Sequence, residues 1–256
     1  MGKSVIGVVI TAKNEELQIG ECITSAKLLT DTVVLIDTGS TDETKAIAEK
    51  MGVMVFDFPN HQYVEPSRKF AIEKTPADWI LILDADEHIT KELSDEIKKV
   101  TSYKLQATSY KIPRKNIFGE TKWLKHGGWW PDAQIRLIHK SSFVDWPKQI
   151  HSTPQVQGAQ GTLNQPLLHY FHGDFESMVE KTVVYEQIEA QLLFEGKKSA
   201  SSITFFRKFL GELMRRLIIK RGFMDGQIGI MESVYQAFSK TTTYLFLYEK
   251  KIHRPL

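Results

Sequence analysis

The chain has 256 residues, of which 42% are hydrophobic and 25% charged, and its formal net charge is +2. These values are typical of a folded globular protein and exclude a disordered or collagen-like chain. The near-neutral total gives no support for a nucleic-acid-binding protein, and we expect no nucleic-acid partner. A single cysteine, Cys22, excludes internal disulfides and a cysteine-based zinc site. We expect no signal peptide and no membrane span, because neither a cleavage-site pattern nor about 18 consecutive apolar residues occur.

Short apolar runs alternate with helical patterns over the first hundred residues. Strands are predicted over residues 5–10, 32–36, 53–58 and 79–83, and helices over 15–29, 43–50, 66–74 and 91–100. This alternation predicts crossover units, and therefore an α/β fold with a mostly parallel sheet flanked by helices. Further strands are predicted over 107–112 and 134–139, and helices from residue 176 onwards. We expect a catalytic domain over residues 1–175 and a helical C-terminal extension over 176–256.

Polar residues cluster just after three of the predicted strands. Thr11 and Asn14 follow the first strand, Asp37 follows the second, and Asp84 and Asp86 follow the fourth. In an open parallel sheet these positions share one edge, where ligands bind. The coincidence predicts a binding site at this edge. The alternative is that polar residues simply end strands.

The sharpest motif is the carboxylate pair Asp84 and Asp86, which follows five apolar residues. Two carboxylates in this arrangement can hold Mg²⁺ or Mn²⁺, whose coordination shell is completed by phosphate oxygens. A nucleoside diphosphate would supply those oxygens, and the metal would neutralise the charge of the leaving diphosphate.

Two rival interpretations compete with a metal–diphosphate site at this motif. An EF-hand loop starting at Asp84 is excluded, because His88 and Ile89 stand at its fifth and sixth positions. The second rival interpretation is that acidic residues stand at the N-terminus of a helix, where they stabilise its dipole. This accounts for Glu87 but not for Asp84, which lies at the end of the strand. The chain has neither a P-loop nor a GxGxxG motif after the first strand, which weighs against a P-loop ATPase and a dinucleotide-dependent dehydrogenase.

Five segments carry a family resemblance. They are VVITAKNEE (8–16), VVLIDTGSTDET (33–44), WILILDADE (79–87), KHGGWWPDAQIRLIHK (125–140) and FMDGQIG (223–229). With them, the chain resembles the family 2 glycosyltransferases of the GT-A fold, a Rossmann-like architecture. More narrowly, it resembles the bacterial branch that includes lipopolysaccharide core β-1,4-glucosyltransferases, which also has histidines near positions 151 and 169.

The resemblance implies an inverting, metal-dependent transferase that uses a UDP-sugar or a related nucleotide sugar, with Mg²⁺ or Mn²⁺. It places Thr11, Lys13, Asn14 and Glu15 in the nucleotide pocket, Asp37 on the base or ribose, Arg68 at the diphosphate, and Asp84 and Asp86 at the ribose, diphosphate and metal. One departure concerns the sugar contacts. The branch has a Gln-basic-Asn pattern before the fourth strand, whereas this chain has Ser67-Arg68-Lys69.

An inverting transfer needs a base on the acceptor hydroxyl. Asp132 is the candidate, because it follows Gly127-Gly128-Trp129-Trp130-Pro131, which can form a platform for a sugar. Arg136, four residues further on, is predicted to pair with Asp132 or with phosphate. The alternative is that Asp132 caps a turn and the tryptophans belong to the core.

Two histidines are candidates for contact with the metal or the diphosphate. His169 is the stronger candidate, because it ends an apolar, strand-like run, and we predict it as a metal ligand; His151 is the weaker one. The alternative for each is a structural histidine.

Residues 203–221 form a predicted basic amphipathic helix, with six Lys or Arg residues against one acid. Such a helix can lie on an anionic membrane, or it can pack on the core with its basic face in solvent. A glycolipid or lipopolysaccharide-type acceptor, which the resemblance suggests, favours the membrane. We therefore expect a cytoplasmic protein, peripheral on the inner face of the bacterial inner membrane. Asp225 and Gly226 are predicted as a turn and cap.

Three alternative functions remain beside the leading one. The first is transfer to polyprenyl phosphate or a peptide; the lack of long apolar helices disfavours the typical polyprenyl-phosphate type. The second is a non-catalytic protein that binds sugar nucleotides or carbohydrate, which the presence of Asp84, Asp86 and Asp132 disfavours. The third is a nucleotidyltransferase, whose Gly-rich, Arg-bearing opening loop is replaced here by TAKNEE.

Overall fold

The computed structural model describes residues 4–59, 64–102, 106–119, 121–147, 152–171 and 175–253. The chain divides into two compact units. The first unit comprises Met1–Lys115 and Ala133–His169, and the second comprises Asn116–Asp132 and Tyr170–Leu256. The predicted boundary at residue 175 stays a prediction.

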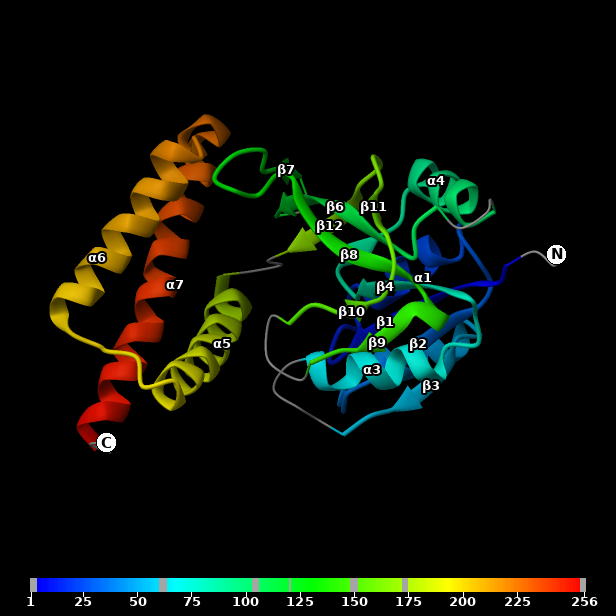
Figure 1. Ribbon diagram of the computed structural model, residues 1–256, viewed down its shortest axis with the longest axis horizontal. Coiled ribbons are helices and arrows are strands. Elements are labelled where there is room, and N and C mark those ends of the chain that lie inside the picture. The colour runs from blue at the N-terminus through cyan, green and yellow to red at the C-terminus, as the bar shows by residue number, and fades with distance from the viewer. Residues whose placement is uncertain are drawn as a thin grey trace. The chain divides into compact units, whose positions relative to one another are not determined.

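The elements follow one another as Figure 1 shows. In chain order the first are β1 (Ile6–Ala12), α1 (Ile19–Ala26), β2 (Val33–Asp37), α2 (Thr44–Lys50), β3 (Met54–Asp57), α3 (Glu65–Lys74), β4 (Trp79–Asp84), β5 (Glu87–His88) and α4 (Lys91–Ser102). Next come β6 (Ser109–Phe118), β7 (Lys122–Trp123), β8 (Asp132–His139), the 3-10 turn η1 (Lys140–Ser142), β9 (Phe143–Asp145), β10 (Gln155–Val156), β11 (Gln160–Thr162) and β12 (Leu167–Phe171). The remainder is helical: α5 (Phe175–Glu195), α6 (Ser202–Leu213), the π-helical η2 (Met214–Ile219), the 3-10 turn η3 (Gly222–Asp225) and α7 (Gly226–His253).

The large sheet has the strand order β3-β2-β1-β4-β8-β6-β12-β5. Parallel pairing joins β3, β2, β1 and β4, whereas β4 pairs with β8, and β12 with β5, in antiparallel fashion. The register aligns Ala12 with Asp37 and Thr11 with Asp84. The predicted α/β fold is confirmed. The expectation that β1, β2 and β4 end at the same edge of the sheet is confirmed as well.

The two faces of the parallel strands bury different side chains. Val8, Ile10 and Leu81 pack in one cluster with residues of α1, α2 and α4. Their neighbours along the strands, such as Val9 and Ile80, pack in a second cluster with residues of α3. Strands covered on both faces need continuous apolar sequences, which is why these runs do not alternate with polar residues. The rigid layer fixes the strand ends that carry the polar residues.

The predicted helix over residues 15–29 begins later, at Ile19. Asn14 adopts a positive φ of 54°. The backbone N–H of Glu15 donates to Oγ1 of Thr44, the first residue of α2, at 2.7 Å, and that of Glu16 donates to Oδ2 of Asp42, in the turn before α2, at 3.1 Å. These bonds take the place of the first helical turn and tie the loop after β1 to the loop after β2.

The second unit contains the helices α5, α6 and α7, and the prediction of helix from residue 176 is confirmed. α7 packs against both α5 and α6 (Figure 1). Glu186 of α5 accepts hydrogen bonds from Ser239 Oγ at 2.6 Å and from Thr243, both of α7. Among the described residues, no helix is long and apolar enough to cross a membrane.

Candidate active site

Asp84, at the carboxyl end of β4, lies between two buried arginines. Arg68 of α3 donates to Asp84 Oδ1, and Arg136 of β8 donates to Asp84 Oδ2 at 2.6 Å. Arg136 also donates to Glu87 Oε1 at 2.6 Å, and Arg114 of β6 lies 3.3 Å from the same oxygen. Arg68 and Arg136 are 4% exposed and Glu87 is fully buried. The cluster therefore places three guanidinium groups around two carboxylates.

The charges of this cluster are fixed by their mutual contact. Burial alone would raise the pKa of Asp84, but Arg136 and Arg68 outweigh it and hold that pKa far below its ordinary value. Burial would lower the pKa of Arg136, and Asp84 and Glu87 raise it instead. Nη1 of Arg68 is buried without a hydrogen-bond acceptor among the described residues. A cationic group with an unused donor beside a strand end suits an anionic ligand such as a diphosphate.

Asp86 lies beside His169, a residue distant in the sequence. The antiparallel pairing of β5 with β12 aligns Glu87 with His169. Asp86 Oδ2 is consequently 3.4 Å from His169 Nε2, and both side chains are partly exposed. Within the described ranges, no group of three or more His, Cys, Asp or Glu side chains is arranged to hold a metal. His151 lies outside the described residues.

Thr11 and Asp37, both predicted to bind the nucleotide, lie in the last residues of β1 and β2, at the same edge of the sheet. Asp37 Oδ2 accepts from the backbone N–H groups of Gly39 and Ser40, each at 3.1 Å. Its other oxygen, Oδ1, is buried and accepts no hydrogen bond from the described part of the chain. The hydroxyl of Thr11 is likewise buried and has no hydrogen-bond partner among the described residues. An unused carboxylate oxygen is suited to the hydroxyl groups of a ribose.

The other three predicted nucleotide residues lie in the loop after β1. Asn14 Oδ1 accepts from the backbone N–H of Thr41 at 2.8 Å, and this holds the loop in place. Lys13 is exposed and Glu15 is half-buried. The structure thus brings Thr11, Lys13, Asn14 and Glu15 to the edge that also carries Asp37 and Asp84.

Asp132, the predicted base, is the first residue of β8 and belongs to the second unit. The side-chain N–H groups of Asn116 lie 3.4 Å from Asp132 Oδ2 and 2.8 Å from the carbonyl oxygen of Trp129. Trp129 stacks on Phe171 with ring centroids 4.7 Å apart. Asp132, Trp129 and Trp130 are all half-buried or partly exposed, so the tryptophans are not core residues.

Three charged residues of the cluster, Arg114, Arg136 and Glu87, are not among the residues predicted for the nucleotide, the metal or the base. Arg136, predicted to pair with Asp132 or with phosphate, bonds the carboxylates of Asp84 and Glu87 rather than that of Asp132. From the sequence, Glu87 is accounted for only through a helix dipole. A sequence signal for Arg136 exists, because QIRLIH places one arginine within an apolar strand. A charge in a buried strand is rarely tolerated without a partner, and that signal alone points to a buried ion pair.

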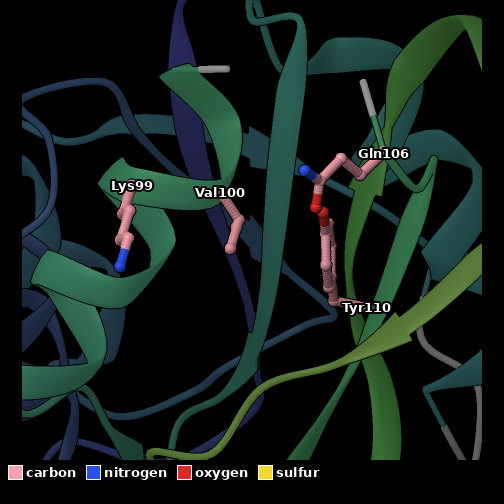
Figure 2. A pocket seen from close by; sticks show the side chains of 4 residues that line it. All are labelled: Lys99, Val100, Gln106 and Tyr110. Carbon is pink, nitrogen blue, oxygen red and sulfur yellow. The ribbon is translucent and has the colours of Figure 1, made fainter. Parts of the chain in front are cut away.

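A small cavity of about 260 Å³ lies elsewhere in the first unit. Lys99, Val100, Gln106 and Tyr110 line it, as Figure 2 shows. Tyr110 packs against Trp79, the first residue of β4, with ring centroids 5.9 Å apart. The cavity is therefore at the opposite end of β4 from Asp84 and is not part of the cluster of charged residues.

Comparison with known proteins identifies glycosyltransferases along nearly the whole chain. An uncharacterized glycosyltransferase of Rickettsia conorii is 28% identical over 253 residues, covering 94% of this chain and 89% of that protein. The lipopolysaccharide core biosynthesis glycosyltransferase LpsC of Rhizobium meliloti is 24% identical over 267 residues, covering 98% and 93%.

Among solved structures, this chain is similar to glucosyl-3-phosphoglycerate synthase from Mycobacterium tuberculosis in complex with Mn²⁺ and UDP-glucose. The identity is 16% and the TM-score 0.49, with 77% of this chain and 81% of that chain covered. Residues 7–155, more than half of the chain, match the family model "Glycosyl transferase family 2". The resemblance stated from the sequence motifs is confirmed, and the chain belongs to glycosyl transferase family 2.

Proposed function

We propose that this protein is an inverting glycosyltransferase that moves a sugar from a UDP-sugar to a cell-envelope acceptor such as lipopolysaccharide core. The observation that carries the proposal is the cluster around Asp84, in which buried arginines bond the carboxylate at the end of β4, at the sheet edge where β1 and β2 also end. Similarity to LpsC over 98% of the chain supports the choice of acceptor.

The donor nucleotide binds at the edge of the sheet in this proposal. Asp37 Oδ1 accepts from a ribose hydroxyl or from the base, and Thr11, Lys13, Asn14 and Glu15 line the nucleotide pocket. Arg68 donates its unused Nη1 to the diphosphate, where a guanidinium is well matched to phosphate oxygens. Asp84 orients Arg68 and Arg136, since each of its two oxygens accepts from one of these arginines.

The residues at the edge fit a divalent cation bound together with the donor. The carboxylate of Asp86 and the imidazole of His169 are close enough, at 3.4 Å, to bind the same ion. Mg²⁺ and Mn²⁺ sites commonly use one or two protein side chains and take their remaining ligands from phosphate and water. We assign Asp86 and His169 to this role, with Asp84 as the predicted third contact. When bound, the cation supplies positive charge that stabilises the leaving diphosphate.

Asp132 acts as the general base. The oxygen of the acceptor hydroxyl forms a bond to the anomeric carbon, while the bond from that carbon to the diphosphate oxygen breaks. The hydroxyl proton goes to the Asp132 carboxylate, and the bonding electrons leave with UDP. Attack opposite the leaving group inverts the anomeric configuration, and the sugar passes through a transition state of oxocarbenium character. Asn116, at 3.4 Å from Asp132 Oδ2, orients the carboxylate.

Calorimetric titration with UDP, GDP, ADP and CMP tests the donor site, each in Mn²⁺, in Mg²⁺ and in EDTA. We expect UDP to bind in the presence of the cation, and Asp86→Ala to weaken that binding at least about tenfold, the scale of losing one ligand or its support. Asp95→Ala is the matched control, because Asp95 forms an exposed pair with Lys91. If UDP bound as tightly in EDTA as in Mn²⁺ or Mg²⁺, the assignment of a metal site would be contradicted. The absence of binding by any of the four nucleotides would contradict the donor site and favour a carbohydrate-binding protein.

The helix α6 supports a membrane-bound acceptor. Ile203, Phe206 and Leu210 of α6 and Met214, the first residue of η2, recur every three or four residues and are all more than half exposed. This defines an apolar stripe on one face of the helix. Arg207, next to Phe206, is exposed in the same region. Apolar side chains beside cationic ones match an anionic lipid surface. The apolar side chains bury in the acyl region, and the cationic ones contact the anionic head groups. We propose that this stripe binds the anionic inner face of the bacterial inner membrane.

Sedimentation with vesicles tests the membrane proposal. The protein should bind vesicles of phosphatidylcholine with about 30% phosphatidylglycerol and not vesicles of phosphatidylcholine alone. The double variant Phe206→Ser/Leu210→Ser should lose at least about tenfold in binding, since burying each of these side chains contributes about 1.5–3 kcal/mol. The control is Leu17→Ser, which removes an apolar side chain that is 91% exposed in the first unit. Equal loss in the control, or binding to both lipids alike, would contradict a specific anionic docking surface.

A further inference from the structure

The loop over residues 124–132, which ends in Asp132, is held by a segment much later in the chain. Both belong to the second unit. Asp225, the last residue of η3, makes three hydrogen bonds to the loop. Its Oδ2 accepts from the backbone N–H groups of Lys125 at 2.9 Å and His126 at 2.7 Å, and its Oδ1 lies 2.8 Å from His126 Nδ1. Both carboxylate oxygens of Asp225 are thereby used to fix the loop.

The backbone of the loop also lies close to the backbone of residues 220–222. The N–H of Gly127 donates to the carbonyl oxygen of Lys220 at 2.8 Å. A Cβ atom on Gly222 would lie 3.4 Å from Gly127 Cα and 2.4 Å from Ser233 Oγ. Gly222 therefore lies where a Cβ atom would collide with Ser233, in van der Waals contact with Gly127. Asp225 is only 5% exposed, so its hydrogen bonds are shielded from water. Hydrogen bonds to a charged group are stronger in such a buried environment than in water.

A second contact comes from the π-helical segment η2. Arg216 donates to the carbonyl oxygen of Gly127 at 3.2 Å, and its guanidinium carbon lies 5.4 Å from the centre of the Trp129 ring. Glu212 accepts from Arg216 Nε at 2.7 Å and so orients this arginine. The loop is thus held from residue 125 to residue 129 by groups of the C-terminal helical region.

The contacts continue from the loop to the proposed base. Asn116 donates to the carbonyl oxygen of Trp129 at 2.8 Å, and the same amide lies 3.4 Å from Asp132 Oδ2. Gly127 and Gly128 both have positive φ, so without external contacts this stretch has unusual conformational freedom. A base has to stay within hydrogen-bond reach of the acceptor hydroxyl, and small displacements are costly to the rate.

We infer that Asp225 is a positioning residue for the transfer step: by clamping residues 125 and 126 it keeps the loop in the conformation that aims Asp132 at the acceptor. The inference rests on the proposed function, because it requires Asp132 to be the base. It gives the FMDG segment a role in acceptor-side chemistry beyond that of a turn and helix cap.

The test uses variants of the full-length protein, with UDP release from UDP-glucose measured in the presence of lipopolysaccharide core oligosaccharide. Rates are expressed per UDP-binding site, counted by calorimetry, so that unfolded protein does not enter the result. We expect Asp225→Ala to lower kcat about 100-fold, the cost of misplacing a reacting group. The Kd for UDP should stay within about twofold, because no predicted nucleotide contact belongs to the second unit. Asp225→Asn should recover most of the activity, because its amide oxygen can still accept from both backbone N–H groups.

Two controls separate positioning from a merely structural role. Glu186→Gln weakens an α5–α7 contact in the same unit without touching the loop, and it should leave kcat unchanged. In an Asp132→Asn background, Asp225→Ala should cause no further loss, since a residue that acts through the base has nothing left to position.

Each opposite outcome overturns the inference. Normal kcat in Asp225→Ala shows that the clamp is not needed. A further loss in the Asp132→Asn background shows that Asp225 acts independently of the base. Asp225→Asn as slow as Asp225→Ala shows that the charge on Asp225 acts through His126 rather than by holding the backbone. A wild-type protein that neither binds UDP nor releases it from UDP-glucose contradicts the proposed function itself, a distinct result.

Discussion

Asp132→Asn is expected to lower kcat about 1,000-fold while leaving the affinity for UDP unchanged. An amide cannot accept the proton of the acceptor hydroxyl, and general base catalysis typically contributes about 100- to 10,000-fold. The amide is nearly the same size as the carboxylate and can still bond Asn116, whose side chain lies 3.4 Å from Asp132 Oδ2. The fold should therefore be preserved. The measurement is UDP release at saturating UDP-glucose and acceptor oligosaccharide, together with the calorimetric Kd for UDP.

The matched control for this variant is Asp95→Asn, which changes an exposed aspartate of α4 that pairs with Lys91 at 2.6 Å. It should retain full activity. If Asp132→Asn kept more than a tenth of the wild-type kcat, Asp132 would not be the base. If its UDP affinity fell in parallel with kcat, the substitution would have disturbed the donor site instead.

Arg136→Met is expected to destabilise the protein by about 3–5 kcal/mol, the range found when one partner of a buried ion pair is removed. Arg136 bonds both Asp84 and Glu87, and Glu87 is fully buried. Methionine fills much of the same volume but leaves these carboxylates without their shared cation. Urea unfolding at neutral pH, followed by fluorescence, measures the change.

Two further variants make this result specific. Lys45→Met breaks the exposed pair with Asp57 and should cost less than about 1 kcal/mol, as is usual for surface ion pairs. Adding Glu87→Gln to Arg136→Met should restore part of the stability, because it neutralises a buried carboxylate that has lost its 2.6 Å contact with Arg136 and keeps the longer contact with Arg114, at 3.3 Å. A loss below about 1 kcal/mol in Arg136→Met would show that the carboxylates find other partners. In that case Arg136 does not hold the cluster together.

Local sequence patterns predict the first half of the fold correctly. The continuous apolar runs of β1, β2 and β4 are dictated by burial on both faces, and Thr90 caps α4 through its bond to the N–H of Leu93 at 3.1 Å. The edge that carries Thr11, Asp37 and Asp84 follows from the same alternation, because parallel strands end together. Short strands such as β5 and β11 carry no such signal, since two or three residues show no periodicity.

The sequence by itself thus determined the family, the parallel strands and the identity of the residues at their ends. Only the tertiary structure decided which charges meet: Arg136 with Asp84, His169 with Asp86, and Asp225 with the loop that leads to Asp132. The physical reason is that each of these contacts joins segments far apart in the chain. Hydrophobic periodicity reports which face of an element is buried, but not which element covers it. The partner of a buried charge depends on strand order and register, which are set by packing over the whole sheet.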